Sequence, residues 1–408
     1  MLEEKPAPQR FFGLDIHKYY LVAIAVDAAG KKVYGPRRVV WADLESWCSK
    51  TLSPQDAVVI EMTTNTWQVY DELRPHVHSI TVVHPPRVQV NMQAQVMTDR
   101  IAAFNLAILL SKGLLKGIWI PSEEVRELRA LLAQRSKMTR LSTQAKNRLH
   151  AVLHRRHIPV GEGNPFLPGR RSWWLSLPLS ASEKVRATCD LDTLAFARQQ
   201  IAALDAHLRQ IAVQEPRLTL LVQLPGFGVL NALTVLAAIG DIARFPDAKH
   251  LVGYAGLGSR IHDSGQTTRT GKITKAGRRD LRAALVEAAQ AAANHHPHWK
   301  AELARLEPRL GRNKAIVAIA RKLLIAIWHV LTFQVADIHA EPLRIARKLM
   351  QVAYQLRIAN LPDGLTAAAS VRAQLDRLKL GRELSAIPYR TERKSVLLTP
   401  STQPPISA

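Results

Sequence analysis

Short apolar stretches alternate with polar turns in the first 120 residues, which predicts an α/β domain. Five of these stretches have the length and flanking turns of β-strands, at residues 11–16, 20–26, 32–40, 56–61 and 79–83. Helical patterns lie at 67–73 and 99–112. Three successive strands, followed by strands that alternate with helices, are typical of an RNase H-like sheet. A Rossmann fold has similar crossovers, but its GxGxxG motif is absent.

The rest of the chain reads as mostly helical. Residues 122–153 form a basic helical stretch, and leucines in near-heptad spacing at 190–213 predict either a coiled coil or an ordinary packed helix. Prolines after residue 385 predict a loosely ordered tail. We therefore expect an RNase H-like domain, a helical or coiled-coil linker, a mainly helical second domain, and a helical extension with its tail. Their bounds are 1–120, 121–220, 221–335 and 336–408.

The net charge is the most informative bulk property of the chain. The 408 residues carry a formal net charge of +23, and hydrophobic residues make up 47% of a chain that reads as globular. Such a charge indicates a polyanionic partner, most commonly nucleic acid, although a basic surface can also serve solubility. Two cysteines, Cys48 and Cys189, support neither a disulfide framework nor a cysteine-based zinc site. We see no signal peptide or membrane span, so we expect a cytoplasmic protein without a membrane partner.

Three carboxylates stand where a metal-dependent nuclease needs them. Asp15 and Glu61 end predicted strands, and Asp99 begins a predicted helix. Strand ends at one edge of a sheet can bring Asp15 and Glu61 together, and Mg²⁺ prefers such oxygen ligands. Two Mg²⁺ ions can stabilise both the attacking and the leaving oxygen of phosphoryl transfer. Each carboxylate alone has a simpler explanation, and Asp99 in particular is a candidate helix cap.

A second set of candidates lies between residues 224 and 279. Leu-Pro-Gly-Phe-Gly at 224–228 is typical of a helix-hairpin-helix turn whose glycines approach a phosphate, or of a plain turn. The run from 254 to 279 is dense in glycine, hydroxyls and cations, yet it lacks the spacing of a Walker loop. Its serine, Ser264, is either a phosphate donor or a nucleophile. The candidate nucleic-acid contacts, with a solvated basic loop as the alternative, are Arg260, Arg269, Lys272, Lys275, Arg278 and Arg279.

These motifs, in this order, resemble the IS110/IS1111 family of insertion-sequence transposases. The resemblance rests on Gly-Leu-Asp-Ile-His-Lys at 13–18, Thr-Asp-Arg-Ile at 98–101, and the long run from Leu-Pro-Gly-Phe-Gly to Gly-Arg-Arg-Asp-Leu-Arg at 224–282. It implies a RuvC-like domain with an Asp-Glu-Asp-Asp tetrad, of which Asp15, Glu61 and Asp99 match three members. It also implies a catalytic serine at Ser264, a Mg²⁺ cofactor, and a phosphoserine intermediate.

The resemblance further implies the partners. Similar proteins are guided by a structured noncoding RNA that pairs with donor and target DNA. They assemble as homo-oligomers, dimers or tetramers, in which the metal site of one subunit serves the serine of another. A hydrolytic junction nuclease of RuvC type and a non-catalytic nucleic-acid scaffold are the two alternatives.

One position departs from the family pattern. The resemblance calls for a fourth acidic residue three positions after Asp99, and this chain has Ala102 there. Positions three apart share a helix face, so both side chains are expected to point at one metal. We therefore expect impaired catalysis in this chain, whether the alanine is natural variation or an engineered inactivating change.

Overall fold

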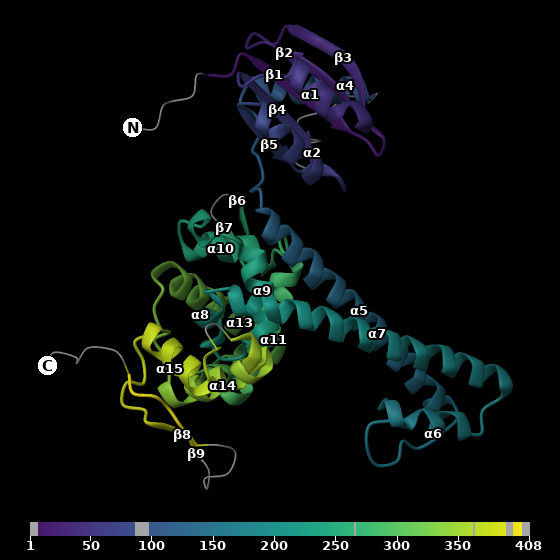
Figure 1. Ribbon diagram of the computed structural model, residues 1–408, viewed down its shortest axis with the longest axis vertical. Coiled ribbons are helices and arrows are strands. Elements are labelled where there is room, and N and C mark those ends of the chain that lie inside the picture. The colour runs from purple at the N-terminus through teal and green to yellow at the C-terminus, as the bar shows by residue number, and fades with distance from the viewer. Residues whose placement is uncertain (1–6, 86–97, 265–266, 362–363, 389–394, 402–408) are drawn as a thin grey trace, which may run out of the picture. The chain divides into compact units, whose positions relative to one another are not determined.

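The computed structural model describes residues 7–85, 98–264, 267–361, 364–388 and 395–401. The chain divides into two compact units, Met1–Pro121 and Ser122–Ala408. The first unit contains a five-stranded sheet with helices, and the second is mostly helical (Figure 1). The mixed α/β content expected of the N-terminal part is therefore confirmed.

The sheet of the first unit has the strand order β3-β2-β1-β4-β5. Its strands are β1 (Arg10–Ile16), β2 (Tyr20–Val26), β3 (Lys32–Val40), β4 (Asp56–Glu61) and β5 (Ser79–Val83). The first three strands pair antiparallel, while β4 pairs parallel to β1 and β5 parallel to β4. This mixed order fits the RNase H-like fold, and the five predicted strands are confirmed.

The period of two along each strand sorts the sheet into two faces. On β1, Phe12 and Leu14 pack into a core with α1 (Leu44–Thr51) and α2 (Thr66–Leu73). The residues between them, Gly13 and Asp15, face α4 (Asp99–Ser111), which packs along β1 and β2. On β4, Val59 packs against Leu106 of α4, which places Glu61 on the same face as Asp15. The α4 face therefore collects the candidate carboxylates.

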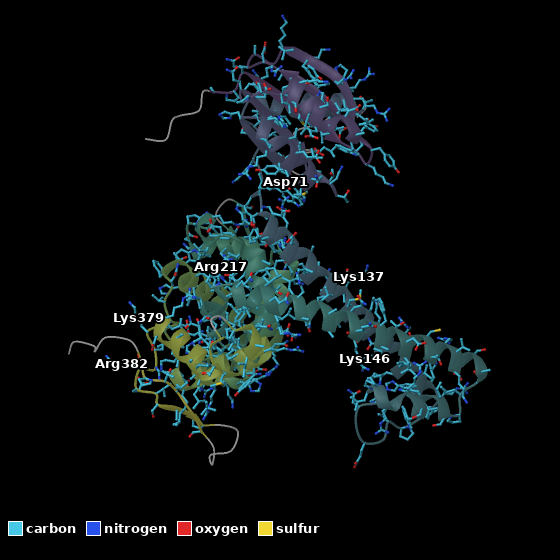
Figure 2. The ribbon with its side chains drawn as sticks, viewed as in Figure 1. Asp71, Lys137, Lys146, Arg217, Lys379 and Arg382 are labelled. Carbon is cyan, nitrogen blue, oxygen red and sulfur yellow. The ribbon has the colours of Figure 1, made fainter. Side chains whose placement is uncertain are left out.

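Two long helices open the second unit and run antiparallel to one another. They are α5 (Glu123–Arg155) and α7 (Ala181–Gln214). Ion pairs join them, and the partner on α7 moves back along the chain as the residue on α5 moves forward. They are Arg135–Asp205, Arg148–Asp190 and Arg156–Glu183. The short helix α6 (Arg171–Ser176) lies at their far end, and Lys137 and Lys146 lie along α5 (Figure 2). The heptad-like leucines of α7 thus pack, at least in part, within this chain.

The remaining helices share one apolar core. They are α8 (Leu218–Val222), α9 (Val229–Ile239), α10 (Ala248–Ala255), α11 (Arg279–His295), α12 (Pro297–Leu310), α13 (Arg312–Phe333), α14 (Pro342–Leu356) and α15 (Ala367–Arg377). Among the described helices, α13 is the one long and apolar enough to cross a membrane by length and composition. One of its faces, which includes Ile319, Leu323 and Ile327, is buried in this core, as in the core helix of a soluble protein.

The prediction of a loosely ordered tail from residue 385 is wrong for the part that the structure describes. Strands β8 (Ala386–Pro388) and β9 (Ser395–Leu397) pair antiparallel, and Ile387 joins the core. The reason is the buried side chain of Arg372 on α15. Its guanidinium donates to the carbonyl oxygens of Thr399, Gly381 and Leu384. Hydrogen bonds to three carbonyls satisfy the buried cation and hold the tail against the helices. Residues 389–394 and 402–408 lie outside the described residues.

Candidate active site

The first part of the candidate site lies where β1 ends and α4 begins. Asp15 is the penultimate residue of β1, and Asp99 is the first residue of α4. The helix is capped by Thr98, whose hydroxyl oxygen accepts from the Ile101 amide at 3.4 Å. The alternative reading of Asp99 as the cap is therefore wrong, and its carboxylate is available to the site.

The structure brings Asp15 and Asp99 together around His17. The His17 Nε2 atom lies 3.2 Å from Asp15 Oδ2 and 3.2 Å from Asp99 Oδ2. The Tyr20 hydroxyl donates a 2.9 Å hydrogen bond to Asp99 Oδ2. One donor atom from each of Asp15, His17 and Asp99 lies within 4.8 Å of the others, and these three are the one such group among the described residues. All three side chains are half-buried.

Glu61 lies beside this group rather than within it. The last registered pair of β1 and β4 is Leu14 with Ile60, so Asp15 and Glu61 follow side by side at the same sheet edge. Burial raises the pKa of Glu61, and the charge of Asp15 raises it further. Burial also raises the pKa of Asp15, which His17 lowers and the Asp99 charge raises. The charge of Asp15 therefore disfavours the ionised form of Glu61, and the charge of Asp99 disfavours that of Asp15.

This arrangement fits a divalent metal. Burial and a neighbouring negative charge raise the pKa of Asp15 and of Glu61, so a dication placed beside them would favour their ionised forms. Oxygen ligands from Asp15, Asp99 and Glu61 are of the kind that Mg²⁺ takes, and the His17 imidazole adds a nitrogen that transition metals accept.

Sequence reasoning missed His17 and Tyr20. The signal for His17 was present, because residues 15 and 17 at the end of a strand project to the same side. Tyr20 reaches Asp99 only through the turn between β1 and β2 and the packing of α4, so its contact depends on tertiary structure.

Ala102 occupies the position where the fourth carboxylate was expected. It lies in the first turn of α4, three residues after Asp99, and is half-buried. The helix geometry places it on the face of Asp99, as the spacing predicted. Phe104 and Ala103, the next residues of the helix, pack instead toward Val22 and Ile24 of β2.

A separate group of candidate residues lies on a β-hairpin in the helical unit. Strand β6 (Ser259–Ser264) pairs antiparallel with β7 (Thr267–Ile273). Ser264 ends β6, is exposed, and accepts a 3.0 Å hydrogen bond at its carbonyl oxygen from the Thr267 hydroxyl. The serine is therefore accessible near the tip of a projecting ribbon.

Backbone hydrogen bonds tie the base of the hairpin to the end of α10. The Thr274 amide donates to Gly258 and the Lys275 amide to Gly256. A side chain is excluded at Gly277, because a Cβ there would lie 2.1 Å from the Tyr254 carbonyl oxygen. The segments around residues 254–258 and 273–278 thus pack against one another, and Gly256 and Gly277 serve this packing.

The predicted nucleic-acid contacts cluster on and beside this hairpin. The exposed members are Arg260, Lys272, Lys275 and Arg279. Arg278 is half-buried and donates to the Asp280 carboxylate, which reduces its freedom to bind a phosphate. Arg269 lies on β7, and its side chain lies outside the described set.

For Gly226, the first glycine of the Leu-Pro-Gly-Phe-Gly turn, the structure favours the plain-turn interpretation. Gly226 has a φ of +84°, and a Cβ there would lie 2.1 Å from the carbonyl oxygen of Ala288 on α11. Phe227 beside it is fully buried. Gly226 and Phe227 therefore serve helix packing, whereas Gly228 is exposed and a Cβ there would meet nothing within 4 Å.

Comparison with known proteins matches both halves of this arrangement. A transposase profile of the DEDD type from the IS110 group matches residues 12–158, and the profile of the "Transposase IS116/IS110/IS902 family" matches residues 218–304. The chain belongs to the IS110 family of transposases. The first match contains the carboxylates of this transposase, and the second contains its hairpin with Ser264.

Relatives of the transposase agree over most of its length. The transposase for insertion sequence element IS1111A of Coxiella burnetii is 26% identical over 341 residues, which cover 80% of this chain and 90% of the relative. A pilin gene-inverting protein of Moraxella bovis is 27% identical, with 72% and 84% covered. A putative transposase, y4qE, of Sinorhizobium fredii is 27% identical, with 60% and 58% covered. The family places the chain among DNA transposases and recombinases of insertion sequences.

Proposed function

We propose that this transposase cuts and rejoins DNA by nucleophilic attack of Ser264, assisted by Mg²⁺ at Asp15, Glu61 and Asp99. The observation that carries the proposal is the meeting of Asp15 and Asp99, from β1 and α4, within metal-binding distance at one edge of an RNase H-like sheet. A bound Mg²⁺ would supply charge stabilisation to the phosphate oxygens during the attack. The family match supports the placement of both the carboxylates and the serine.

The carboxylates and Ser264 have separate roles in the proposed reaction. The carboxylates of Asp15, Glu61 and Asp99 would hold the metal, which would stabilise charge on the DNA phosphate. The Ser264 oxygen forms a bond to phosphorus while the bond from phosphorus to one deoxyribose oxygen breaks. The serine gives up its proton, and the departing oxygen takes one to become a free hydroxyl. Reversal by a hydroxyl of the partner strand rejoins DNA, so the phosphodiester energy is conserved without ATP.

We also propose a structured noncoding RNA as the guide, pairing with donor and target DNA. The net charge of +23 and the exposed cations Arg260, Lys272, Lys275 and Arg279 support binding of several nucleic-acid strands. The carboxylates and Ser264 lie in different units of the chain, which suits a dimer or tetramer whose subunits share active sites. We place the protein in the cytoplasm, on the nucleoid.

The test combines the purified protein with RNA transcribed from the DNA flanking its gene and with plasmids that carry donor and target sites. Recombinant plasmids are expected with Mg²⁺, most clearly for Ala102→Asp. In that background Ser264→Ala should abolish recombination. Ser259→Ala, an exposed serine at the other end of β6, should preserve it.

Other outcomes select the alternatives. Nicked but never rejoined DNA, formed equally well by Ser264→Ala, would identify a hydrolytic junction nuclease. Binding without any cleavage, even by Ala102→Asp, would identify a non-catalytic scaffold. Recombination without the flanking RNA would overturn RNA guidance alone.

A further inference from the structure

The hydroxyl of Tyr20 fixes one oxygen of Asp99. It donates a 2.9 Å hydrogen bond to Asp99 Oδ2, the same oxygen that lies 3.2 Å from His17 Nε2. The rings of Tyr20 and His17 lie 4.8 Å apart, so the two side chains support each other. Because both contacts fall on Oδ2, they set the rotation of the whole carboxylate. Ala102, three residues after Asp99, lies on the same face of α4 and offers no polar atom to this group.

Arg38 on β3 stacks on the Tyr20 ring. Its guanidinium carbon lies 3.9 Å from the ring centroid, and its side chain is exposed. The register pairs Arg38 with Val22, which makes it a diagonal neighbour of Tyr20 on the α4 face. Stacking on an aromatic face restricts an arginine while its N–H donors stay free to bind a phosphate bidentately.

The neighbouring arginine points the other way. Arg37 lines a cavity of about 580 Å³ on the α1 face, together with Tyr34, Trp47 and Lys50. The alternation of the strand thus separates two adjacent cations. Arg38 lies on the face of the acid cluster, which consists of Asp15, Glu61 and Asp99. Arg37 lies on the opposite side of the sheet.

We propose that Tyr20 is a positioning residue that orients Asp99 for metal binding, and that Arg38, stacked on Tyr20, binds the phosphate backbone of the DNA strand entering the acid cluster. This inference rests on the proposed metal-assisted function. Within the described residues, the guanidinium stacks on the ring and forms no ion pair with the three carboxylates. The cation is thereby kept from occupying the metal's place, yet it lies at the rim of the site.

The first test measures metal affinity without DNA or activity. Metal-free full-length protein is titrated with Mn²⁺, and binding is followed by calorimetry. Tyr20→Phe keeps the ring and its stacking with Arg38 but removes the hydrogen bond to Asp99. Loss of a group that orients a metal ligand costs about 10- to 100-fold in metal affinity, and a loss near the lower end is expected here. Tyr19→Phe is the matched control, because Tyr19 is 66% exposed. The Mn²⁺ affinity of this variant should equal that of the wild type.

The second test separates Arg38 from Tyr20. Arg38→Gln should bind Mn²⁺ no more weakly than the wild type, because it removes a nearby positive charge. Its affinity for duplex DNA should fall, and the slope of log affinity against log salt should decrease by about one. Arg37→Gln, the control on the other face, should change the slope less.

Two results would overturn the inference alone. One is a Tyr20→Phe protein that binds Mn²⁺ like the wild type while Asp15→Asn does not bind it. The other is an equal effect of Arg38→Gln and Arg37→Gln on DNA binding. Mn²⁺ binding that is unaffected by Asp15→Asn would instead contradict the metal site, and with it the proposed function.

Discussion

Gly13 on β1 lies directly against the backbone of Ala103 on α4. A Cβ at residue 13 would stand 2.0 Å from the Ala103 carbonyl oxygen and 2.6 Å from the Ala107 amide nitrogen. No side chain fits there, so the absence of a Cβ allows the helix to approach the strand closely. This approach sets the position of Asp99 at the start of α4 relative to Asp15, two residues beyond Gly13.

Gly13→Ala should therefore disturb both stability and the acid cluster. Overpacking of a tight core contact costs about 1–3 kcal/mol, and occasionally more. Urea denaturation should show a loss of this size, and Mn²⁺ affinity should fall because α4 carries Asp99 away from Asp15. Gly117→Ala is the control, since its Cβ would come no closer than 3.2 Å to the Thr81 side chain. If Gly13→Ala lowered stability but left the metal affinity unchanged, the close approach of α4 to β1 would not be what positions Asp99 for metal binding.

The sequence predicted the sheet well because its information is local. Alternating apolar residues defined each strand, and parallel β1 and β4 brought Asp15 and Glu61 to one edge. The contact of Tyr20 with Asp99 was missed because it depends on how α4 lies across β2.

Residue types alone could not decide two other segments. The Leu-Pro-Gly-Phe-Gly turn was compatible with phosphate binding or with a plain turn, and the structure shows Gly226 against the backbone of Ala288. Prolines after residue 385 indicated a loose tail, whereas Arg372 binds its carbonyl groups. Both contacts join segments that are distant in sequence, and composition does not report such contacts.

Ala102→Asp should strengthen the metal site. The new carboxylate would join Asp99 on one helix face, adding an oxygen ligand and a negative charge. Mn²⁺ affinity and Mg²⁺-dependent DNA cleavage should both rise. Ile101→Asp adds the same charge at the neighbouring, exposed position and should produce neither effect. Equal cleavage by the wild type and Ala102→Asp would show that position 102 does not contribute a ligand.

Lys348 gives the helical unit an unusual pH dependence. Its ammonium group donates to the Leu224 carbonyl oxygen, and burial lowers its pKa to about 7. In the unfolded chain, the pKa of Lys348 returns to the ordinary lysine value of about 10.4. Between about pH 7 and this value, the unfolded state therefore binds more protons than the folded state. This group therefore makes stability rise with pH from about 7 to about 10.

Replacement of Lys348 by Met should remove that dependence. Melting temperature should increase at pH 6, where burial penalises the charged lysine most, and the gain should shrink towards pH 10. The lost hydrogen bond to Leu224 offsets about 1 kcal/mol at every pH. Lys300→Met, an exposed lysine on α12, provides the comparison. A gain that does not vary with pH would contradict the lowered pKa.

Nucleic-acid binding should weaken steeply with salt. A protein that contacts six or more phosphates loses about 10³-fold or more in affinity between 50 and 200 mM salt. Lys272→Gln, on the exposed hairpin, should reduce the slope by about one. Arg305→Gln should leave it unchanged, because Arg305 is paired with Glu302 at 2.8 Å. Salt-insensitive binding would contradict an electrostatic interface.

The central claim is that Ser264 becomes covalently linked to DNA, and direct mapping of the adduct tests it. The Ala102→Asp protein is incubated with Mg²⁺, the flanking RNA and labelled DNA whose design traps the cleaved strand, then denatured, digested and analysed by mass spectrometry. A nucleotide joined to Ser264 through phosphate is the predicted result. Cleaved DNA without any adduct, or an adduct on another residue, would contradict the mechanism.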